Sequence, residues 1–249
     1  METLQQLSFY NRFREAVKKR TVDNMVVPLS GGLDSTLIVK ALYDNGDIDK
    51  AKFVTLGYDE YVLAVEERYN ISTNSFYIRE NKEDARKIIE ILEEPFYSSS
   101  VNYYLYREIN ALGSRVSLSG LGADELFGGY DYYNTDRYPR GLFKEINAKS
   151  NSDKKKNDIH FLIHHHLREN EKIGLYWEVE GRYPFLDKEV CKFKDVGKSL
   201  IKAALLQDFS ESFVNRKKEG FRIDNNTDRE HQRKEYKKQF LLWCDIFTK

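Results

Sequence analysis

Two glycine-rich stretches carry the residue types that bind phosphate and divalent metal. The first is Ser-Gly-Gly-Leu-Asp-Ser at residues 30–35, directly after a short apolar run. Glycines let backbone N–H groups approach an anion, serine hydroxyls can donate, and a following helix N-terminus adds positive potential. Asp34 has little purpose in a phosphate cradle by itself, but it fits if it holds Mg²⁺ against a polyphosphate. The stretch lacks the lysine that ends a P-loop, so it is a different kind of phosphate loop.

The second stretch, residues 119–130, is Ser-Gly-Leu-Gly-Ala-Asp-Glu-Leu-Phe-Gly-Gly-Tyr and also follows an apolar run. Its two adjacent carboxylates, Asp124 and Glu125, have a simpler interpretation as side chains that complement a helix dipole. The first stretch also has a simpler interpretation, as a tight glycine turn before a helix. Two glycine loops that each contain an aspartate favour a magnesium–nucleotide site over both simple interpretations.

These loops need a scaffold that brings them together. Strand and helix patterns alternate over residues 24–120, which predicts an α/β fold with a doubly wound parallel sheet and helices on both faces. Ligands of such sheets bind beyond the carboxyl ends of the strands, so the loops after Leu29, Leu56 and Leu118 are expected to converge. The predicted strands are residues 25–29, 52–57, 75–78 and 115–118.

The strand pattern fades after Tyr130. Residues 150–158 are polar and charged and predict a loop, and the rest of the chain has mainly helical patterns. We therefore expect a single domain over residues 1–249, with an N-terminal helix at 1–20, a nucleotide-binding α/β part at 21–130 and a mainly helical part at 131–249.

Taken with three further motifs, the two loops resemble the synthetase domain of the asparagine synthetase family, whose members are PP-loop ATP pyrophosphatases with an adenine nucleotide alpha hydrolase-like fold. Glu94-Pro95-Phe96 resembles the family's acidic-Pro-Phe element. Residues 180–187, Glu-Gly-Arg-Tyr-Pro-Phe-Leu-Asp, resemble its Glu-x-Arg-x-Pro-Phe-Leu-Asp signature, and residues 216–221 resemble its late basic loop. The agreement covers about residues 24–223.

The resemblance implies ATP-dependent amide formation with Mg²⁺. A carboxylate attacks the α-phosphate of ATP, pyrophosphate leaves, and ammonia or an amine takes the acyl group from AMP. The implied catalytic residues are Lys218, Asp124 and Glu180, with Lys218 neutralising charge between the α- and β-phosphates. Asp34 and Asp124 are the implied metal ligands. The implied nucleotide-binding residues are Leu29, Ser30, Gly31, Gly32, Asp34, Ser35, Leu56, Ser119 and Gly120.

The sequence departs from the family pattern in two places. Complete asparagine synthetases carry an N-terminal glutaminase domain with a cysteine nucleophile, and this chain begins Met1-Glu2-Thr3, so we expect a synthetase domain without its own glutaminase. Leu121 replaces a glutamate that is thought to accept a proton from ammonia or to help bind the substrate. The acid is aspartate or another carboxylate, and nitrogen comes from ammonia, an amine or a separate glutaminase subunit.

Composition limits the possible partners. Forty Lys and Arg balance forty Asp and Glu, which argues against a nucleic-acid or membrane-surface binder. Only two cysteines are present, no apolar run approaches the length of a bilayer span, and the N-terminus does not resemble a signal peptide, so we expect a cytoplasmic protein. A homo-oligomer is compatible with the sequence.

Two alternatives remain open at this point. One is another PP-loop activity, such as a nucleotide- or tRNA-modifying ligase, which the neutral charge disfavours. The other is a non-catalytic ATP-binding paralogue, which Leu121 favours. The presence of Asp34, Asp124 and Lys218 opposes it.

Overall fold

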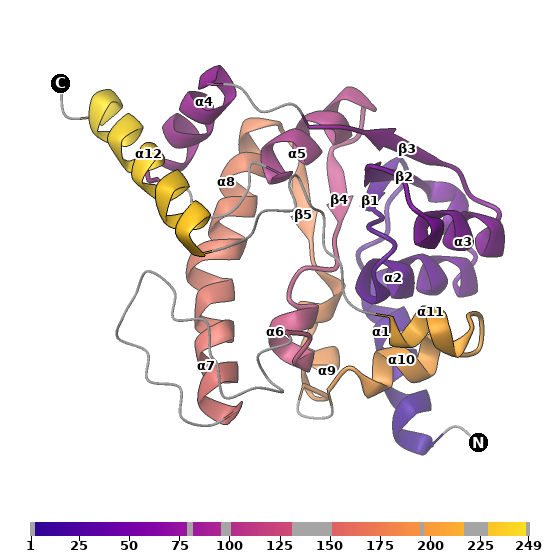
Figure 1. Ribbon diagram of the computed structural model, residues 1–249. Coiled ribbons are helices and arrows are strands. Elements are labelled where there is room, and N and C mark those ends of the chain that lie inside the picture. The colour runs from indigo at the N-terminus through magenta and orange to yellow at the C-terminus, as the bar shows by residue number, and fades with distance from the viewer. Residues whose placement is uncertain are drawn as a thin grey trace.

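The chain folds around a five-stranded, entirely parallel sheet. A computed structural model describes residues 3–78, 82–95, 101–130, 151–194, 197–216 and 229–247. The strands have the order β3-β2-β1-β4-β5 (Figure 1). Their bounds are β1 (Met25–Pro28), β2 (Ala51–Leu56), β3 (Thr73–Phe76), β4 (Val116–Leu118) and β5 (Glu180–Arg182). The predicted parallel α/β fold is confirmed.

A helix or helical turn follows each of the five strands, as a doubly wound sheet requires, and further helices pack around them. In the first half they are α1 (Leu4–Lys18), α2 (Leu33–Asp44), the 3₁₀ turn η1 (Ile48–Lys50), α3 (Glu60–Tyr69), α4 (Lys82–Leu92), α5 (Val101–Ala111) and α6 (Ala123–Phe127). In the second half they are α7 (Asn151–Phe161), the π-helix η3 (Leu162–Leu167), α8 (Arg168–Tyr176), the 3₁₀ turn η4 (Pro184–Leu186), α9 (Lys188–Cys191), α10 (Ser199–Leu205), α11 (Glu211–Asn215) and α12 (Arg229–Phe247). None of the described helices is both long enough and apolar enough to cross a membrane.

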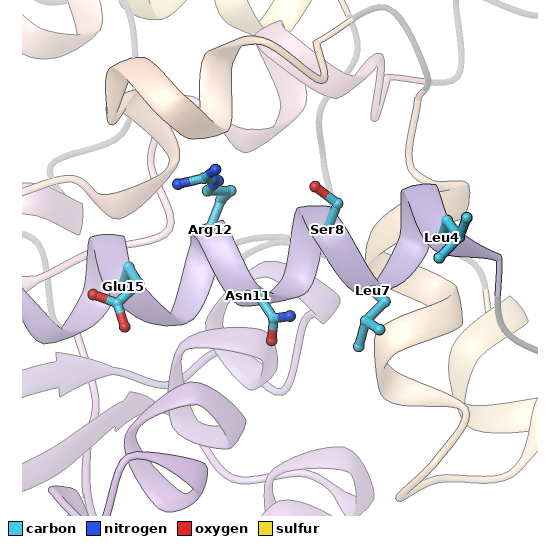
Figure 2. Close-up of a pocket in the computed structure, with 6 residues that line it drawn as sticks. All are labelled: Leu4, Leu7, Ser8, Asn11, Arg12 and Glu15. Atoms are coloured by element: carbon cyan, nitrogen blue, oxygen red, sulfur yellow. The ribbon is translucent and has the colours of Figure 1, made fainter.

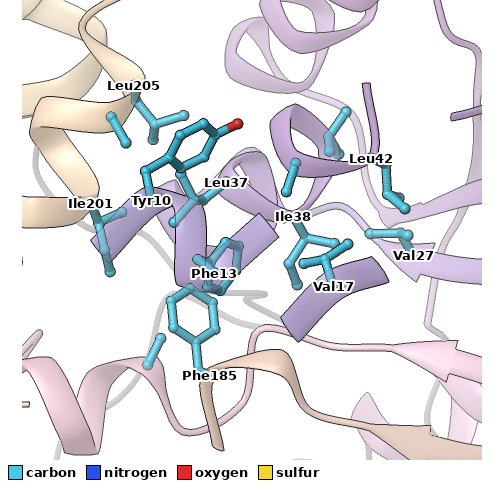
Figure 3. Packing of buried hydrophobic residues seen from close by; sticks show 14 of the residues in the cluster. Tyr10, Phe13, Val17, Val27, Leu37, Ile38, Leu42, Phe185, Ile201 and Leu205 are labelled. Carbon is cyan, nitrogen blue, oxygen red and sulfur yellow. The ribbon is translucent and has the colours of Figure 1, made fainter. Parts of the chain in front are cut away.

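Each face of the sheet has its own hydrophobic core. Successive residues of β1 alternate between them: Met25 and Val27 belong to one cluster, and Val26 belongs to the other. The larger cluster joins the sheet to α1, α2 and α10, and Figure 3 shows Phe13 and Phe185 close together within it. The smaller cluster lies under α4, α5 and α8. Helices therefore cover both faces, as the alternating pattern predicts.

Sequence analysis did not predict strand β5. β5 pairs with β4, and Val116 lies opposite Glu180. A backbone hydrogen bond extends the pairing at each end: Glu180 N donates to Arg115 O, and Ser119 N donates to Arg182 O. Gly181 leaves space for a tyrosine, because a Cβ there would stand 2.1 Å from the Tyr183 hydroxyl. A three-residue strand without apolar residues gives no sequence pattern to detect.

The predicted polar loop at residues 150–158 is wrong. Residues 151–158 belong to α7, which packs against α6. Lys154 and Asp158 are four residues apart and therefore share one helical face, and each is only 6% exposed. A run of charges predicts a solvated segment only when its side chains face water, and here one face of the helix is covered.

Candidate active site

The first glycine loop needs glycine for two reasons at Gly31. Its φ is +65°, and a Cβ there would lie 2.9 Å from Tyr61 Cβ at the start of α3. The serines brace the loop, since Ser30 Oγ accepts from Gly32 N at 3.2 Å and Ser35 Oγ donates to Gly32 O at 3.1 Å. Gly32, the N-cap residue of α2, has no side chain with which to cap the helix. The loop therefore presents backbone donors and the positive end of a helix dipole, as a phosphate site requires.

The second glycine loop lies directly against the first. A Cβ at Gly120 would stand 3.2 Å from Asp34 Cβ and 3.5 Å from Ser35 N, so the two backbones meet with almost no space between them. Gly122, at φ +90°, turns the chain into α6 next to Leu186. The structure thus brings the two predicted loops together at the carboxyl edge of the sheet.

A lysine that sequence analysis did not single out joins the two aspartates. Lys198 Nζ donates to Asp34 Oδ1 and lies 3.0 Å from Asp124 Oδ1. Burial on its own lowers the pKa of the Lys198 ammonium, but the Asp34 and Asp124 carboxylates outweigh it and hold that pKa above its ordinary value. All three side chains are between 15% and 18% exposed, so a cation at this point is partly shielded from water.

The second loop is shaped around this group. A Cβ at Gly129 would stand 1.9 Å from Asp124 Oδ1 and 2.6 Å from Lys198 Cε, so only glycine fits beside the pair. Glu125, the neighbouring carboxylate, is 3% exposed and accepts a 2.5 Å hydrogen bond from the Tyr130 hydroxyl. Burial and the Glu125 and Asp124 carboxylates raise the pKa of Tyr130 far above its ordinary value. Glu125 therefore holds the end of the loop, and Asp124 faces the site.

The donor set suits magnesium bound through a nucleotide. Two carboxylates on different loops reach a single ammonium, so one cation already binds both of them. Within the described ranges, no three His, Cys, Asp or Glu side chains are grouped to hold a metal. Mg²⁺ in nucleotide sites commonly takes one or two carboxylates and completes its shell with phosphates and water. Asp34 and Asp124 match that pattern.

The residues predicted to flank the base occupy the same edge. Leu29 follows β1 and bonds through its N–H to Val54 O at 2.8 Å, and Leu56 ends the neighbouring strand β2. Leu29 is fully buried in the core, so its backbone and not its side chain faces the edge. Leu56 is half-buried. Ser119 and Gly120 follow β4 on the other side of β1.

Of the other two predicted catalytic residues, the structure describes only Glu180, which is not part of this group. Glu180 lies at the amino end of β5 and makes a two-point ion pair with Arg182, with both contacts at 2.9 Å. The Arg182 guanidinium lowers the pKa of the Glu180 carboxyl, and no contact in the described part of the chain joins Glu180 to the glycine loops. Lys218 lies outside the described residues. Both catalytic roles stay predictions.

An open hollow on α1 contains none of these residues. Its lining comes entirely from one helix and consists of Leu4, Leu7, Ser8, Asn11, Arg12 and Glu15 (Figure 2). The hollow contains neither glycine loop and none of the predicted site residues. It plays no part in the site.

Comparison with known proteins agrees with the sequence resemblance. Residues 8–158 match the family described as asparagine synthase. The chain is 29% identical over 205 residues to asparagine synthetase [glutamine-hydrolyzing] 3 of Arabidopsis thaliana, covering 72% of this chain and 33% of that protein. It is 33% identical over 125 residues to asparagine synthetase B [glutamine-hydrolyzing] of Escherichia coli, covering 49% of this chain and 20% of that protein.

A third relative is matched over a longer stretch. The probable asparagine synthetase [glutamine-hydrolyzing] of Schizosaccharomyces pombe is 27% identical over 261 residues, which covers 92% of this chain and 43% of that protein. The chain thus spans from about a fifth to less than half of the length of these relatives.

Proposed function

Because this chain belongs to the asparagine synthase family, we propose that it is an ATP-dependent ligase that forms a carbon–nitrogen bond by adenylating a carboxylate. The observation that carries the proposal is the shared contact of Asp34 and Asp124 with Lys198, beside an uncapped helix start. A phosphate cradle, two metal-binding carboxylates and a buried cation at one point are the parts that nucleotidyl transfer needs.

The reaction has two steps. In the first, a carboxylate oxygen of the substrate attacks the α-phosphorus of ATP, and the bond from that phosphorus to the bridging oxygen breaks to release pyrophosphate. In the second, ammonia or an amine attacks the acyl carbon, loses a proton, and expels AMP. Bound Mg²⁺ would neutralise phosphate charge in the first step.

The residues of the chain divide between binding and charge stabilisation. Ser30, Gly31, Gly32 and Ser35 bind the pyrophosphate portion through backbone N–H and hydroxyl donors. The base lies between the strand ends at Leu29 and Leu56, beside Ser119 and Gly120. Lys198 sets the spacing of Asp34 and Asp124, and Lys218 stabilises charge between the α- and β-phosphates.

Further observations support a single domain, a cytoplasmic location and an aspartate substrate. A single domain is supported by β5 and Lys198, because both come from the later half and complete the sheet and site of the earlier half. The low cysteine count, two in the whole sequence, is in keeping with a reducing cytoplasm. Aspartate is the leading candidate for the acid because the relatives are asparagine synthetases. The nitrogen source is ammonia, an amine or a partner protein.

Leu121 supports a second candidate, an ATP-binding paralogue that has lost its acceptor chemistry. A leucine cannot accept a proton from an attacking nitrogen. This candidate predicts nucleotide binding without adenylation, whereas the leading proposal predicts both.

Carboxylate-dependent exchange of labelled pyrophosphate into ATP tests the proposal. The assay uses the whole chain with Mg²⁺, ATP and a panel of acids that includes aspartate. Exchange that depends on one acid supports adenylation. Tight ATP binding without exchange for any acid favours the paralogue, and the absence of ATP binding overturns both.

A further inference from the structure

Arg216, directly after α11, lies against the ring of Tyr61 in the first turn of α3. Its guanidinium carbon is 3.9 Å from the centre of the Tyr61 ring and 4.4 Å from that of Phe213. Both distances are within the range of a cation–π interaction. The cation is thus held between two rings from different helices, α3 and α11.

Tyr61 connects this cation to the phosphate loop. A Cβ at Gly31 would lie 2.9 Å from Tyr61 Cβ and 3.1 Å from Val62 N, so the first turn of α3 packs directly on the loop. Arg216 therefore lies one side chain away from the backbone donors predicted to hold pyrophosphate. Its long side chain carries five N–H donors in a planar fork.

The charge of Arg216 has no dedicated carboxylate within the described ranges. Its one hydrogen bond there runs from Nη1 to Phe213 O at 3.3 Å. Burial lowers the pKa of the guanidinium, against the influence of nearby groups that include Asp59 and Asp34. Asp59 Oδ1 already caps α3 through Tyr61 N and Val62 N, and Asp34 is shared with Lys198. Arg216 is therefore a half-buried cation near Asp34, with one hydrogen bond among the described residues.

The segment before Arg216 is firmly anchored. Phe213 stacks on Phe209 at 4.2 Å between ring centres, with 16° between the planes. Asp208, one residue before Phe209, binds Lys40 and Arg68. Because these contacts fix Asp208 and Phe213, the segment that leads to Arg216 is held in position before any ligand binds.

We propose that Arg216 binds the outer phosphates of ATP and makes the site selective for the triphosphate over AMP. The ligand class is a polyphosphate anion, because a planar guanidinium fork matches paired phosphate oxygens and a stacked arginine loses little entropy on binding. The inference rests on the proposed function and deepens it by assigning a selectivity residue. Arg216 contacts the part of ATP that leaves as pyrophosphate and makes no contact with the AMP portion.

Calorimetry with inorganic pyrophosphate and with AMP, each in the presence of Mg²⁺, tests this assignment. Arg216→Met should weaken pyrophosphate binding about 10- to 100-fold, the range for a lost charge-assisted hydrogen bond, and change AMP binding less than about twofold. Arg216→Lys should fall between, because it keeps the charge without the fork. Arg14→Met is the matched control: Arg14 is also half-buried, but it bonds Asp44 O and Asn45 at the far end of α2.

Each outcome has a separate meaning. Pyrophosphate affinity of Arg216→Met within about twofold of the parent, or an equal loss for AMP, overturns the assignment while leaving the ligase proposal in place. A parent chain that binds neither pyrophosphate nor ATP overturns both. Thermal melting shows whether Arg216→Met is folded at the assay temperature. If it is not, Arg216→Lys decides, and unchanged pyrophosphate binding by that variant counts against the assignment.

Discussion

Two lysines in this protein, Lys40 and Lys198, each bind two aspartates, yet their surroundings differ. Lys40 Nζ lies 2.5 Å from Asp208 Oδ2 and 3.3 Å from Asp44 Oδ2. Lys198 joins Asp34 and Asp124. The Lys40 and Asp208 side chains are both 5% exposed and Asp44 is 27% exposed, whereas all three side chains of the Lys198 group are 15–18% exposed. The Lys40–Asp208 ion pair is therefore sealed from water, whereas both ion pairs of Lys198 stay partly accessible.

The neighbours of each group explain its role. Asp208 also accepts from Arg68 and from the Tyr69 hydroxyl at 3.1 Å, and Asp44 accepts from the Tyr10 hydroxyl at 2.6 Å. Every donor comes from α1, α2 or α3, so the Lys40 group fastens the segment after α10 to three helices. The Lys198 group stands instead between two glycine loops, and its three side chains each keep 15–18% of their surface exposed. We infer that saturation with donors marks the structural group and access marks the functional one.

The largest expected effect is on stability, from Asp208→Asn. Removing one partner of a buried ion pair leaves an uncompensated charge, which costs about 3–5 kcal/mol. Here Lys40 loses its closer carboxylate and Arg68 loses its only described one. Urea unfolding measures the change in the free energy of unfolding. Asp124→Asn is the matched variant and should cost less, because Lys198 keeps Asp34 and has more access to water. Equal losses in the two variants would contradict the comparison.

The second effect is on chemistry, from the same Asp124→Asn variant. Loss of one preorganised charge at a phosphoryl-transfer site typically costs about 10²-fold or more in rate. Carboxylate-dependent ATP–pyrophosphate exchange should fall by that factor while the melting temperature changes little. Asp44→Asn serves as the control, since it changes an aspartate of the other lysine group and should leave exchange per folded molecule unchanged. Parental exchange in Asp124→Asn would refute the metal-site assignment.

How far the sequence could predict these groups depends on their separation along the chain. Each glycine loop is contiguous and follows an apolar strand, so both loops and the sheet edge that joins them could be predicted. The contact between Lys198 and Asp34 joins residues 164 positions apart, and a lone lysine after a glycine has no distinguishing pattern. Asp208 and Lys40 are 168 positions apart and equally hidden. β5 is set by its pairing with β4, which local patterns do not encode.

The third effect concerns acid stability. Burial alone raises the pKa of the Asp208 carboxyl, but hydrogen bonds from Lys40 and Arg68 outweigh it and hold that pKa below its ordinary value. The unfolded chain therefore binds this proton more readily, and stability from Asp208 is complete above the unfolded pKa of about 4 and lost as pH falls through the folded one. The stability gap between parent and Asp208→Asn should be constant from pH 7 to about 5 and shrink below about 4. Unfolding curves of both proteins at four pH values measure this difference in the free energy of unfolding. A difference that widens in acid would contradict the lowered pKa of Asp208.

The smallest expected effect on adenylation comes from Leu121→Glu, which tests whether acceptor chemistry is separable from the Lys198 group. The Leu121 N–H donates to Ser119 Oγ at 3.3 Å, a backbone contact that the substitution leaves in place. ATP–pyrophosphate exchange should therefore stay within about threefold of the parent, since metal and lysine charges act on the phosphates. Amide formation from free ammonia should rise, about tenfold or more, if the new carboxylate accepts the proton that the attacking nitrogen loses.

Leu121→Gln is the control, because glutamine has the size and polarity of glutamate without the proton acceptor. A rise with glutamine equal to that with glutamate would assign the effect to polarity, and a loss of exchange with either would show that Leu121 supports the nucleotide loop itself.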